Sequence, residues 1–288
     1  MRYLKAELNY AIHIKDYITT NPCDIFRGRV SLQSDKSTQH LTIRESQELW
    51  EYLGKLYGIE EADCNPLQLD EVKSWGLGQK VLNGYAEVQL EVIALELLSG
   101  LRQVEVRELT WDKVYINKSQ YDEGYGEGPY FEITTSKQKK PFGIPITKQM
   151  ENLFRRRLKK KKNNYVFPSP FRNNMPISED RYGFRVLQKL MPPSSLKNSN
   201  SLTSKVLRDT FATAGYALYR DSRLIQRLTA HFTGQNRELN ATASYIHMQA
   251  TDHREHFEEI NSFLTGEHKL PDEIEDWDDM GKYPSLKR

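Results

Sequence analysis

The segment GYAEVQLEVIALELLS, residues 84–99, constrains the fold more than any other part of the chain. Its apolar side chains recur around the whole circumference of a helix, whereas a surface helix carries them along one stripe. A helix of this kind has to be covered by other elements, and a chain of 288 residues is long enough to provide that cover. We therefore expect residues 84–99 to form a helix at the centre of a hydrophobic core.

Local patterns predict the elements around this helix. Residues 4–19 read as a short amphipathic helix, and Thr42 with Glu45 forms a capping-box pattern ahead of a second helix. Stretches rich in β-branched and aromatic residues predict short strands at 113–117, 129–135 and 142–147. Residues 148–264 read as helices interrupted by proline-rich segments. The expected class is mainly α with a small antiparallel β-sheet, that is, α+β.

Cysteine content and hydropathy bear on the compartment. Cys23 and Cys64 are the only cysteines, so neither a disulfide framework nor a structural zinc site is expected. No apolar run reaches the ~18–20 residues that span a bilayer, and the first residues contain no apolar signal segment. We expect a reducing, cytoplasmic compartment.

Charge is distributed unevenly along the chain. Residues 137–231 contain 21 lysines and arginines against 5 acidic residues, and residues 255–280 contain 10 acidic residues against 1 basic. The octet RRRLKKKK at 155–162, taken alone, is typical of a solvated helix face. An excess sustained over a whole region indicates a polyanionic partner, of which nucleic acid is the usual one. The acidic end could be a disordered solubilising segment or a cover for the basic surface.

Four segments carry residues suited to phosphate chemistry. They are SGLRQVEVRELTWDKV with Arg102 and Glu105, TTSKQKKPFGIPI with Lys137, SKVLRDTFATAG with Lys205 and Arg208, and LTAHFTGQNRELNATASYIH with His231 and Tyr245. Each segment alone has an ordinary explanation, such as a surface ion pair, a solvated lysine or a core histidine. Metal-free cleavage of a phosphodiester needs a nucleophile, cations around the phosphate oxygens and a proton donor, and the four segments together contain all three.

In this order the segments resemble the tyrosine recombinase, or phage integrase, family. The resemblance extends from about Asn21-Pro22 to His247 and implies the catalytic-domain fold of that family. It implies that Arg102 and Arg208 clamp the scissile phosphate and that Lys137 protonates the leaving 5′ oxygen or contacts the adjacent base. His231 would hydrogen-bond the phosphate, and Tyr245 would attack to give a 3′-phosphotyrosyl link. Glu105 would support the Arg102 segment, and neither metal nor cofactor is implied.

The sequence departs from the family pattern at several positions. Lys205 stands where the family usually has histidine, and it could act as a base on the tyrosine only if burial and Arg208 lowered its pKa. A DNA phosphate between Lys205 and Arg208 would let the two cations tolerate each other. Asp209 is also unusual, and it could brace a neighbouring arginine. Tyr245 is preferred over Tyr216 and Tyr219 because it alone follows the histidine.

The resemblance also predicts an organisation into parts. We expect residues 1–20 to be the last helix of a core-binding domain, 21–40 a linker, 41–266 the catalytic domain and 267–288 an acidic tail. Double-stranded DNA and further copies of the chain are the expected partners, as a tetramer on DNA and a monomer or dimer off it. Residues 250–266 are expected to dock onto a neighbouring subunit, and the source is expected to be prokaryotic or phage-encoded, with the protein at the nucleoid.

Three functions remain open at this point. The first is a site-specific recombinase or integrase. The second keeps the same chemistry but ends as a telomere resolvase or a type IB topoisomerase-like enzyme. The third is a catalytically silent DNA-binding protein with the same fold, which the intact set of arginines, histidine and tyrosine argues against.

Overall fold

The computed structural model describes residues 40–57, 85–117, 128–134, 141–178, 181–190, 202–230, 250–268 and Trp277. The chain divides into two units, Met1–Thr38 and Gln39–Arg288, and all of the described residues belong to the second. The helix expected at residues 4–19 lies outside the described residues. None of the described helices is both long and apolar enough to cross a membrane.

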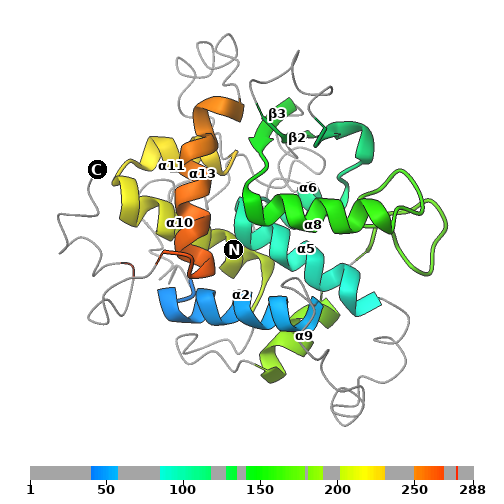
Figure 1. Ribbon diagram of the computed structural model, residues 1–288. Helices are drawn as coiled ribbons and strands as arrows, with labels where there is room; N and C mark the ends of the chain where they lie inside the picture. The colour runs from blue at the N-terminus through cyan, green and yellow to red at the C-terminus, as the bar shows by residue number, and fades with distance from the viewer. Residues whose placement is uncertain are drawn as a thin grey trace, which may run out of the picture. The chain divides into compact units, whose positions relative to one another are not determined.

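Helices dominate the described part of the chain, and its strands form one small sheet (Figure 1). In chain order the elements are α2 (Ile43–Tyr57), α5 (Tyr85–Ser99), α6 (Gln103–Arg107), the 3-10 helix η2 (Trp111–Lys113), β1 (Val114–Tyr115), β2 (Tyr130–Thr134), β3 (Pro141–Pro145), α8 (Lys148–Lys159), α9 (Arg181–Leu190), α10 (Ser204–Tyr219), α11 (Ser222–Leu228) and α13 (Ala250–Thr265). This arrangement confirms the predicted class, mainly α with a small antiparallel sheet.

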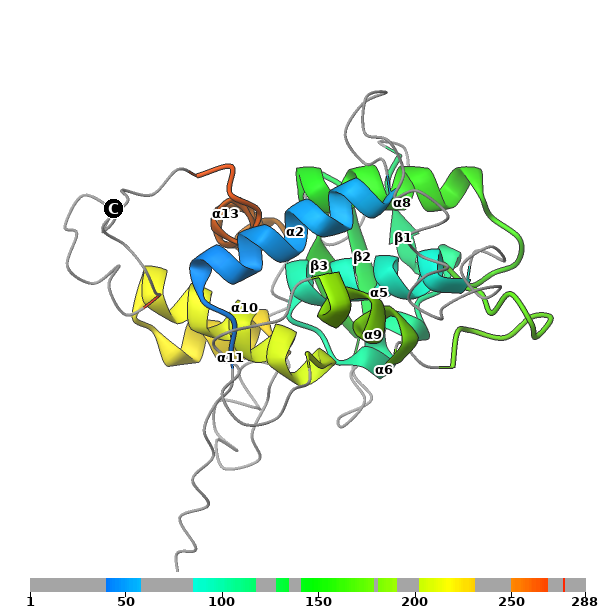
Figure 2. The same ribbon diagram turned by 90° about the horizontal axis from the view of Figure 1, so that it is seen from below.

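Helix α5 is the central element that its sequence predicts. It packs against α2, α8, α9, α10 and α13 (Figures 1 and 2). Its described side chains from Val88 onward are buried. Helix α9 comes especially close, since a Cβ added to Gly183 would lie 2.9 Å from the Cδ1 atom of Ile93. Leu101, which directly precedes Arg102, is also fully buried, so the chain is still inside the core where it leaves α5.

The capping box at the start of α2 is confirmed. The backbone N–H of Thr42 donates to Glu45 Oε2 at 3.1 Å, and the backbone N–H of Glu45 donates to Thr42 Oγ1 at 3.3 Å. Each side chain thus satisfies a backbone donor that the first turn of a helix leaves unpaired.

The sheet is antiparallel throughout, in the order β1-β2-β3. Phe131 in the central strand pairs with Val114 on one side and Ile144 on the other, and its ring lies 5.4 Å from that of Phe154 in α8. The three predicted strands are therefore confirmed, somewhat shorter than expected. The strands β2 and β3 form a hairpin that leads toward residues 135–140 at one end and opens at Pro129 and Ile146 at the other.

The basic octet is not wholly a solvated face. Arg155 and Lys159 to Lys162 are exposed, but Arg157 is 3% exposed and its Nη1 lies 3.0 Å from Glu91 Oε2 in α5. Arg156 pairs with the other oxygen of the same carboxylate. The prediction of a solvated face is wrong at these two arginines, because the buried Glu91 requires cations beside it.

Trp277 lies within the segment expected to be an acidic tail, yet it is only 1% exposed. Its indole Nε1–H donates to the carbonyl of Leu41 at 2.8 Å, and the N–H of Leu41 donates to Thr210 Oγ1 at 2.9 Å. One side chain from the end of the chain therefore completes the core beside the start of α2 and the middle of α10.

Candidate active site

The site is built at the C-terminal end of α5, where Gly100 turns the chain. Gly100 has a φ of +62°, and a Cβ there would lie 2.5 Å from the Cδ1 atom of Phe211 in α10. A larger residue would meet both a left-handed backbone and this ring, so glycine is the residue that fits. The close approach brings α10 directly against the loop that carries Arg102.

Arg102 is held in place by Glu105, one turn further along. The backbone N–H of Arg102 donates to Glu105 Oε2 at 3.0 Å, and its Nη1 donates to Glu105 Oε1 at 3.1 Å. The Glu105 side chain is 1% exposed, while that of Arg102 is 24% exposed. The buried carboxylate thus holds both the backbone and the side chain of Arg102 and leaves part of that side chain exposed to solvent.

Arg208 reaches the same place from the first half of α10. Its Nη1 donates to the carbonyl of Gly100 and its Nη2 to the carbonyl of Thr229, both at 2.7 Å. Burial, and after it repulsion by Arg102, lowers the pKa of Arg208 to about 10, although Glu105 and Asp209 act to raise it. The carbonyls bring no charge and the two carboxylates compensate Arg208 only in part, so an anion bound here would be stabilised by both arginines.

Lys205 precedes Arg208 by three residues but has different surroundings. Its side chain is 74% exposed, and its Nζ lies 3.9 Å from Asp209 Oδ2. Asp209 supplies the negative charge that these two neighbouring cations lack otherwise. Burial raises the pKa of the Asp209 carboxyl, which Lys205, Arg208 and His40 act to lower. The burial that a general-base role for Lys205 would need is absent from this structure.

Lys137, His231 and Tyr245 lie outside the described residues, so their positions are not part of the geometry above. The described residues next to them are informative. Thr229, two residues before His231, is the residue whose carbonyl binds Arg208. Helix α13 begins at Ala250, five residues after Tyr245.

The two other tyrosines considered from the sequence have different surroundings in α10. Tyr219 is partly buried, its hydroxyl donates to Glu259 Oε2 at 2.5 Å, and burial together with that carboxylate raises its pKa. A phenol in that state is a poor nucleophile. Tyr216 is 46% exposed, with the Arg220 guanidinium 5.6 Å from its ring centroid.

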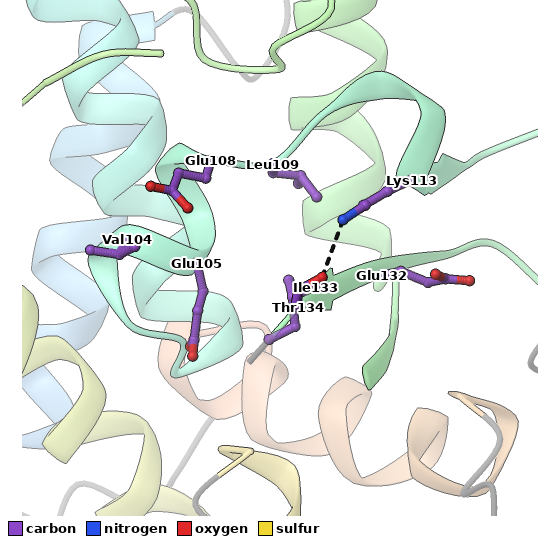
Figure 3. A pocket seen from close by; sticks show the side chains of 8 residues that line it. All are labelled: Val104, Glu105, Glu108, Leu109, Lys113, Glu132, Ile133 and Thr134. Carbon is purple, nitrogen blue, oxygen red and sulfur yellow. Dashed lines mark hydrogen bonds between the residues drawn. The ribbon is translucent and has the colours of Figure 1, made fainter. Parts of the chain in front are cut away.

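A cavity of about 170 Å³ lies next to Glu105 and is lined by residues of α6, η2 and β2 (Figure 3). Its lining residues are Val104, Glu105, Glu108, Leu109, Lys113, Glu132, Ile133 and Thr134. Lys113 Nζ donates to Thr134 Oγ1 at 3.2 Å across one side of it, and burial raises the pKa of Glu132, which Lys113 acts to lower. The cavity separates the helix that supports Arg102 from the strand that leads to Lys137.

Sequence reasoning found the arginines but missed their acceptors, the carbonyls of Gly100 and Thr229. Backbone carbonyls carry no sequence signal, although the glycine after α5 marked the turn. Among the residues that the structure describes, no group of three or more His, Cys, Asp or Glu side chains could hold a metal ion.

Comparison with known proteins identifies a family. The model of the phage integrase family matches residues 83–251, more than half of the chain. No curated protein matches the sequence.

Several solved structures resemble this one at low sequence identity. XerH site-specific recombinase bound to its difH substrate is 16% identical, with 78% of this chain and 52% of that chain covered and a TM-score of 0.47. A lambda integrase dimer bound to a COC′ core site is 17% identical, with 81% and 71% covered and a TM-score of 0.49. XerA recombinase is 17% identical, with 94% and 91% covered and a TM-score of 0.38. The chain spans about half the length of the XerH chain that it matches.

Proposed function

The chain belongs to the phage integrase family of tyrosine recombinases, and on that premise we propose that it cleaves and rejoins DNA through a covalent phosphotyrosyl link. Its substrate in this proposal is double-stranded DNA, and its reaction is site-specific recombination or integration without metal or ATP. The proposed catalytic domain is residues 41–266, preceded by a linker at 21–40 and the last helix of a core-binding domain at 1–20.

One observation carries the proposal: Arg102 and Arg208 come together at the end of α5, and the described hydrogen bonds of Arg208 go to carbonyls and not to a carboxylate. Glu105 neutralises Arg102 from the buried side, and Arg208 is held by carbonyls that bring no charge. Each guanidinium has five N–H donors, so each keeps donors for a ligand after these bonds are made. A phosphodiester offers the non-bridging oxygens that two such groups bind, and the pair would stabilise the extra charge of the transition state.

In the proposed step the Tyr245 hydroxyl oxygen attacks the phosphorus. The new bond joins that oxygen to the 3′-phosphate, the bond from phosphorus to the 5′ oxygen breaks, and the phenol proton passes to solvent. Lys137 gives a proton to the departing 5′ oxygen, leaving a free 5′-hydroxyl. Because one phosphate ester replaces another, the reverse reaction with a second 5′-hydroxyl rejoins the strand.

Supporting roles follow from the surroundings of the remaining residues. Glu105 holds Arg102, and His231 hydrogen-bonds the phosphate from a segment that begins beside Arg208. Lys205 contacts the DNA phosphate as an exposed cation, in the position where the family usually has histidine. Its exposure favours this electrostatic role over a proton-transfer role.

The proposed assembly is a tetramer on DNA, since exchanging two duplexes requires four active sites. Helix α13 packs on α2, α5, α10 and β3 of its own chain in this structure. Docking of residues 250–266 onto a neighbouring subunit remains a prediction, and it would require α13 to leave these contacts. We place the protein at the nucleoid, in a prokaryotic or phage setting.

The test is covalent trapping on a suicide substrate. Nicked duplexes tiled across the DNA that flanks the protein's own gene are incubated with the wild type and with Tyr245→Phe, in EDTA, and resolved on a denaturing gel. We expect an adduct that resists EDTA and disappears with Tyr245→Phe.

Tyr216→Phe is the matched control, because it removes the hydroxyl of an exposed tyrosine in α10 and should leave the adduct unchanged. DNA binding without any adduct would instead support the silent DNA-binding function. An adduct that persists in Tyr245→Phe would assign the nucleophile to another residue.

A further inference from the structure

Arg254 in α13 donates hydrogen bonds to the open end of the β2–β3 hairpin. Its Nη1 donates to the carbonyl of Ile146 at 3.0 Å, and its Nη2 donates to the carbonyl of Pro129 at 2.8 Å. Ile146 follows β3 and Pro129 precedes β2, and the N–H of Ile146 donates to the same Pro129 carbonyl at 2.9 Å. One guanidinium therefore ties both strands of the hairpin to α13.

Gly128 leaves the space that this contact needs. It has a φ of +104°, and a Cβ at this position would lie 2.7 Å from Arg254 Nη2. Any side chain there would push against the guanidinium and would strain the backbone as well. The contact is thus built into the local backbone and is not a chance approach of a long surface side chain.

The docking of α13 itself does not depend on Arg254. Phe257, Ile260, Phe263 and Leu264 are buried in the core, and Asn261 Nδ2 donates to Thr147 Oγ1 at 2.9 Å. Burial of four such side chains is a far larger contribution than two hydrogen bonds. Where α13 packs on its own chain, as it does here, Arg254 accordingly acts on the hairpin and holds it against a helix that these buried side chains fix in place.

At its other end the hairpin has less support. The bond from Lys113 to Thr134 is exposed to solvent, and the cavity of about 170 Å³ lies alongside (Figure 3). The turn between Thr134 and Pro141 contains Lys137, the proposed proton donor. At the open end, by contrast, Arg254 adds two hydrogen bonds that reach both strands, so it helps to set the orientation of the hairpin there.

We propose that Arg254 is a positioning residue that aligns the hairpin carrying Lys137 with the helix that follows Tyr245. The inference rests on the proposed function. It links the nucleophile segment and the proton donor through one side chain that touches neither DNA nor the reacting atoms. A displacement of about 1 Å in a reacting group can cost about 10²-fold in rate, so a small tilt at the open end is sufficient to matter.

A substrate with sulfur in place of the bridging 5′ oxygen tests this role. A 5′-thiolate leaves without receiving a proton, so its departure does not need Lys137. At the cleavage position mapped with the wild type, we expect Arg254→Met to form adduct about 10²-fold more slowly on the oxygen substrate. On the sulfur substrate its rate should approach that of the wild type, and Arg254→Lys should be intermediate because lysine lacks the fork that spans two carbonyls.

Two controls separate positioning from stability. Ile260→Val removes one buried methyl group on the same helix, where the side chain lies beside Gly215 of α10, and should show no rescue by sulfur. Arg44→Met removes an exposed arginine of α2 and should leave both rates unchanged. Gly128→Ala, which crowds the guanidinium, should reproduce the sulfur-rescued defect if Arg254→Met does not fold.

Equal slowing of Arg254→Met on both substrates, or no slowing on either, would overturn the inference while the wild-type adduct leaves the proposed function standing. Absence of any wild-type adduct, on oxygen and sulfur substrates alike, would overturn both.

Discussion

Among the residues that the structure describes, two places bring a pair of arginines together, and the pairs differ in the groups that compensate their charge. Arg156 and Arg157 share the buried carboxylate of Glu91, one on each oxygen. At Arg102 and Arg208 the described ion pair is Glu105 with Arg102, whereas Arg208 donates to two carbonyls and feels Glu105 and Asp209 only through their charge. The charge of the first pair is compensated within the fold, whereas the second pair keeps N–H donors and positive charge that a ligand could use.

This comparison of the two arginine pairs shows how structural cations can be distinguished from functional ones in a basic protein. The local density of basic residues does not distinguish structural from functional cations, since Arg156 and Arg157 lie in the most basic octet of the chain and Arg208 lies next to an aspartate. The charge balance around each cation does distinguish them, because a buried cation without a matching anion costs free energy unless a ligand supplies the charge. Three substitutions test this distinction between structural and functional cations.

The largest effect is expected for Arg208→Ala. Losing one set of fixed donors at the phosphate should slow adduct formation by about 10³-fold. The free energy of unfolding should change by only about 1 kcal/mol, because two carbonyl hydrogen bonds are lost and no buried charge is left behind. Single-turnover trapping and urea unfolding measure the two quantities. A large loss of stability with normal activity of the folded fraction would break the distinction.

The converse is expected for Glu91→Leu. Removing the shared carboxylate leaves Arg157 buried without an anion, which should lower the free energy of unfolding by about 3 kcal/mol. Adduct formation per folded molecule should be unchanged. Glu151→Leu, which removes the exposed partner of Arg155 on the same helix, is the matched control and should cost less than about 1 kcal/mol. If both variants cost the same, the buried cluster is no more structural than a surface pair.

The smallest effect concerns Asp209, the carboxylate next to Arg208 in the sequence. Burial raises its pKa above that of the unfolded chain, so its proton stabilises the fold below pH ~4 and that contribution is lost as the pH rises through the folded pKa. Compared with Asp209→Asn, the wild type should therefore lose stability between pH 3.5 and pH 7, by less than about 1 kcal/mol. The opposite slope in urea unfolding would mean that Asp209 is a fully formed ion pair.

Much of the fold was predictable because local signals and burial agree. Residues 84–99 are apolar on every face and form the central helix, and the Thr42–Glu45 pattern forms the capping box it encodes. The strands were predictable from β-branched and aromatic residues between loops. At the site, the positions of Arg102 and Arg208 came from an ordered set of motifs, and the structure brings these two side chains to one place.

Long-range pairings were not predictable in the same way. The partners of Arg208 are carbonyls 108 and 21 residues away, and every residue has a carbonyl. Arg254 offered no signal either, since its partners are the carbonyls of Pro129 and Ile146. Glu91 was a usable signal, because an acidic residue in the middle of a mostly apolar, central helix implies a buried cation elsewhere in the chain.

The burial of Trp277 has a practical consequence for anyone preparing fragments of this protein. A fragment ending at Gly266 follows the domain boundary that the sequence suggests, yet it would remove a core side chain and its bond to Leu41. It would leave an apolar hollow beside the start of α2, in a region that also contacts α10 through Thr210. Fragments designed for expression should extend at least through residue 277, and a C-terminal affinity tag should follow Trp277 and not replace it.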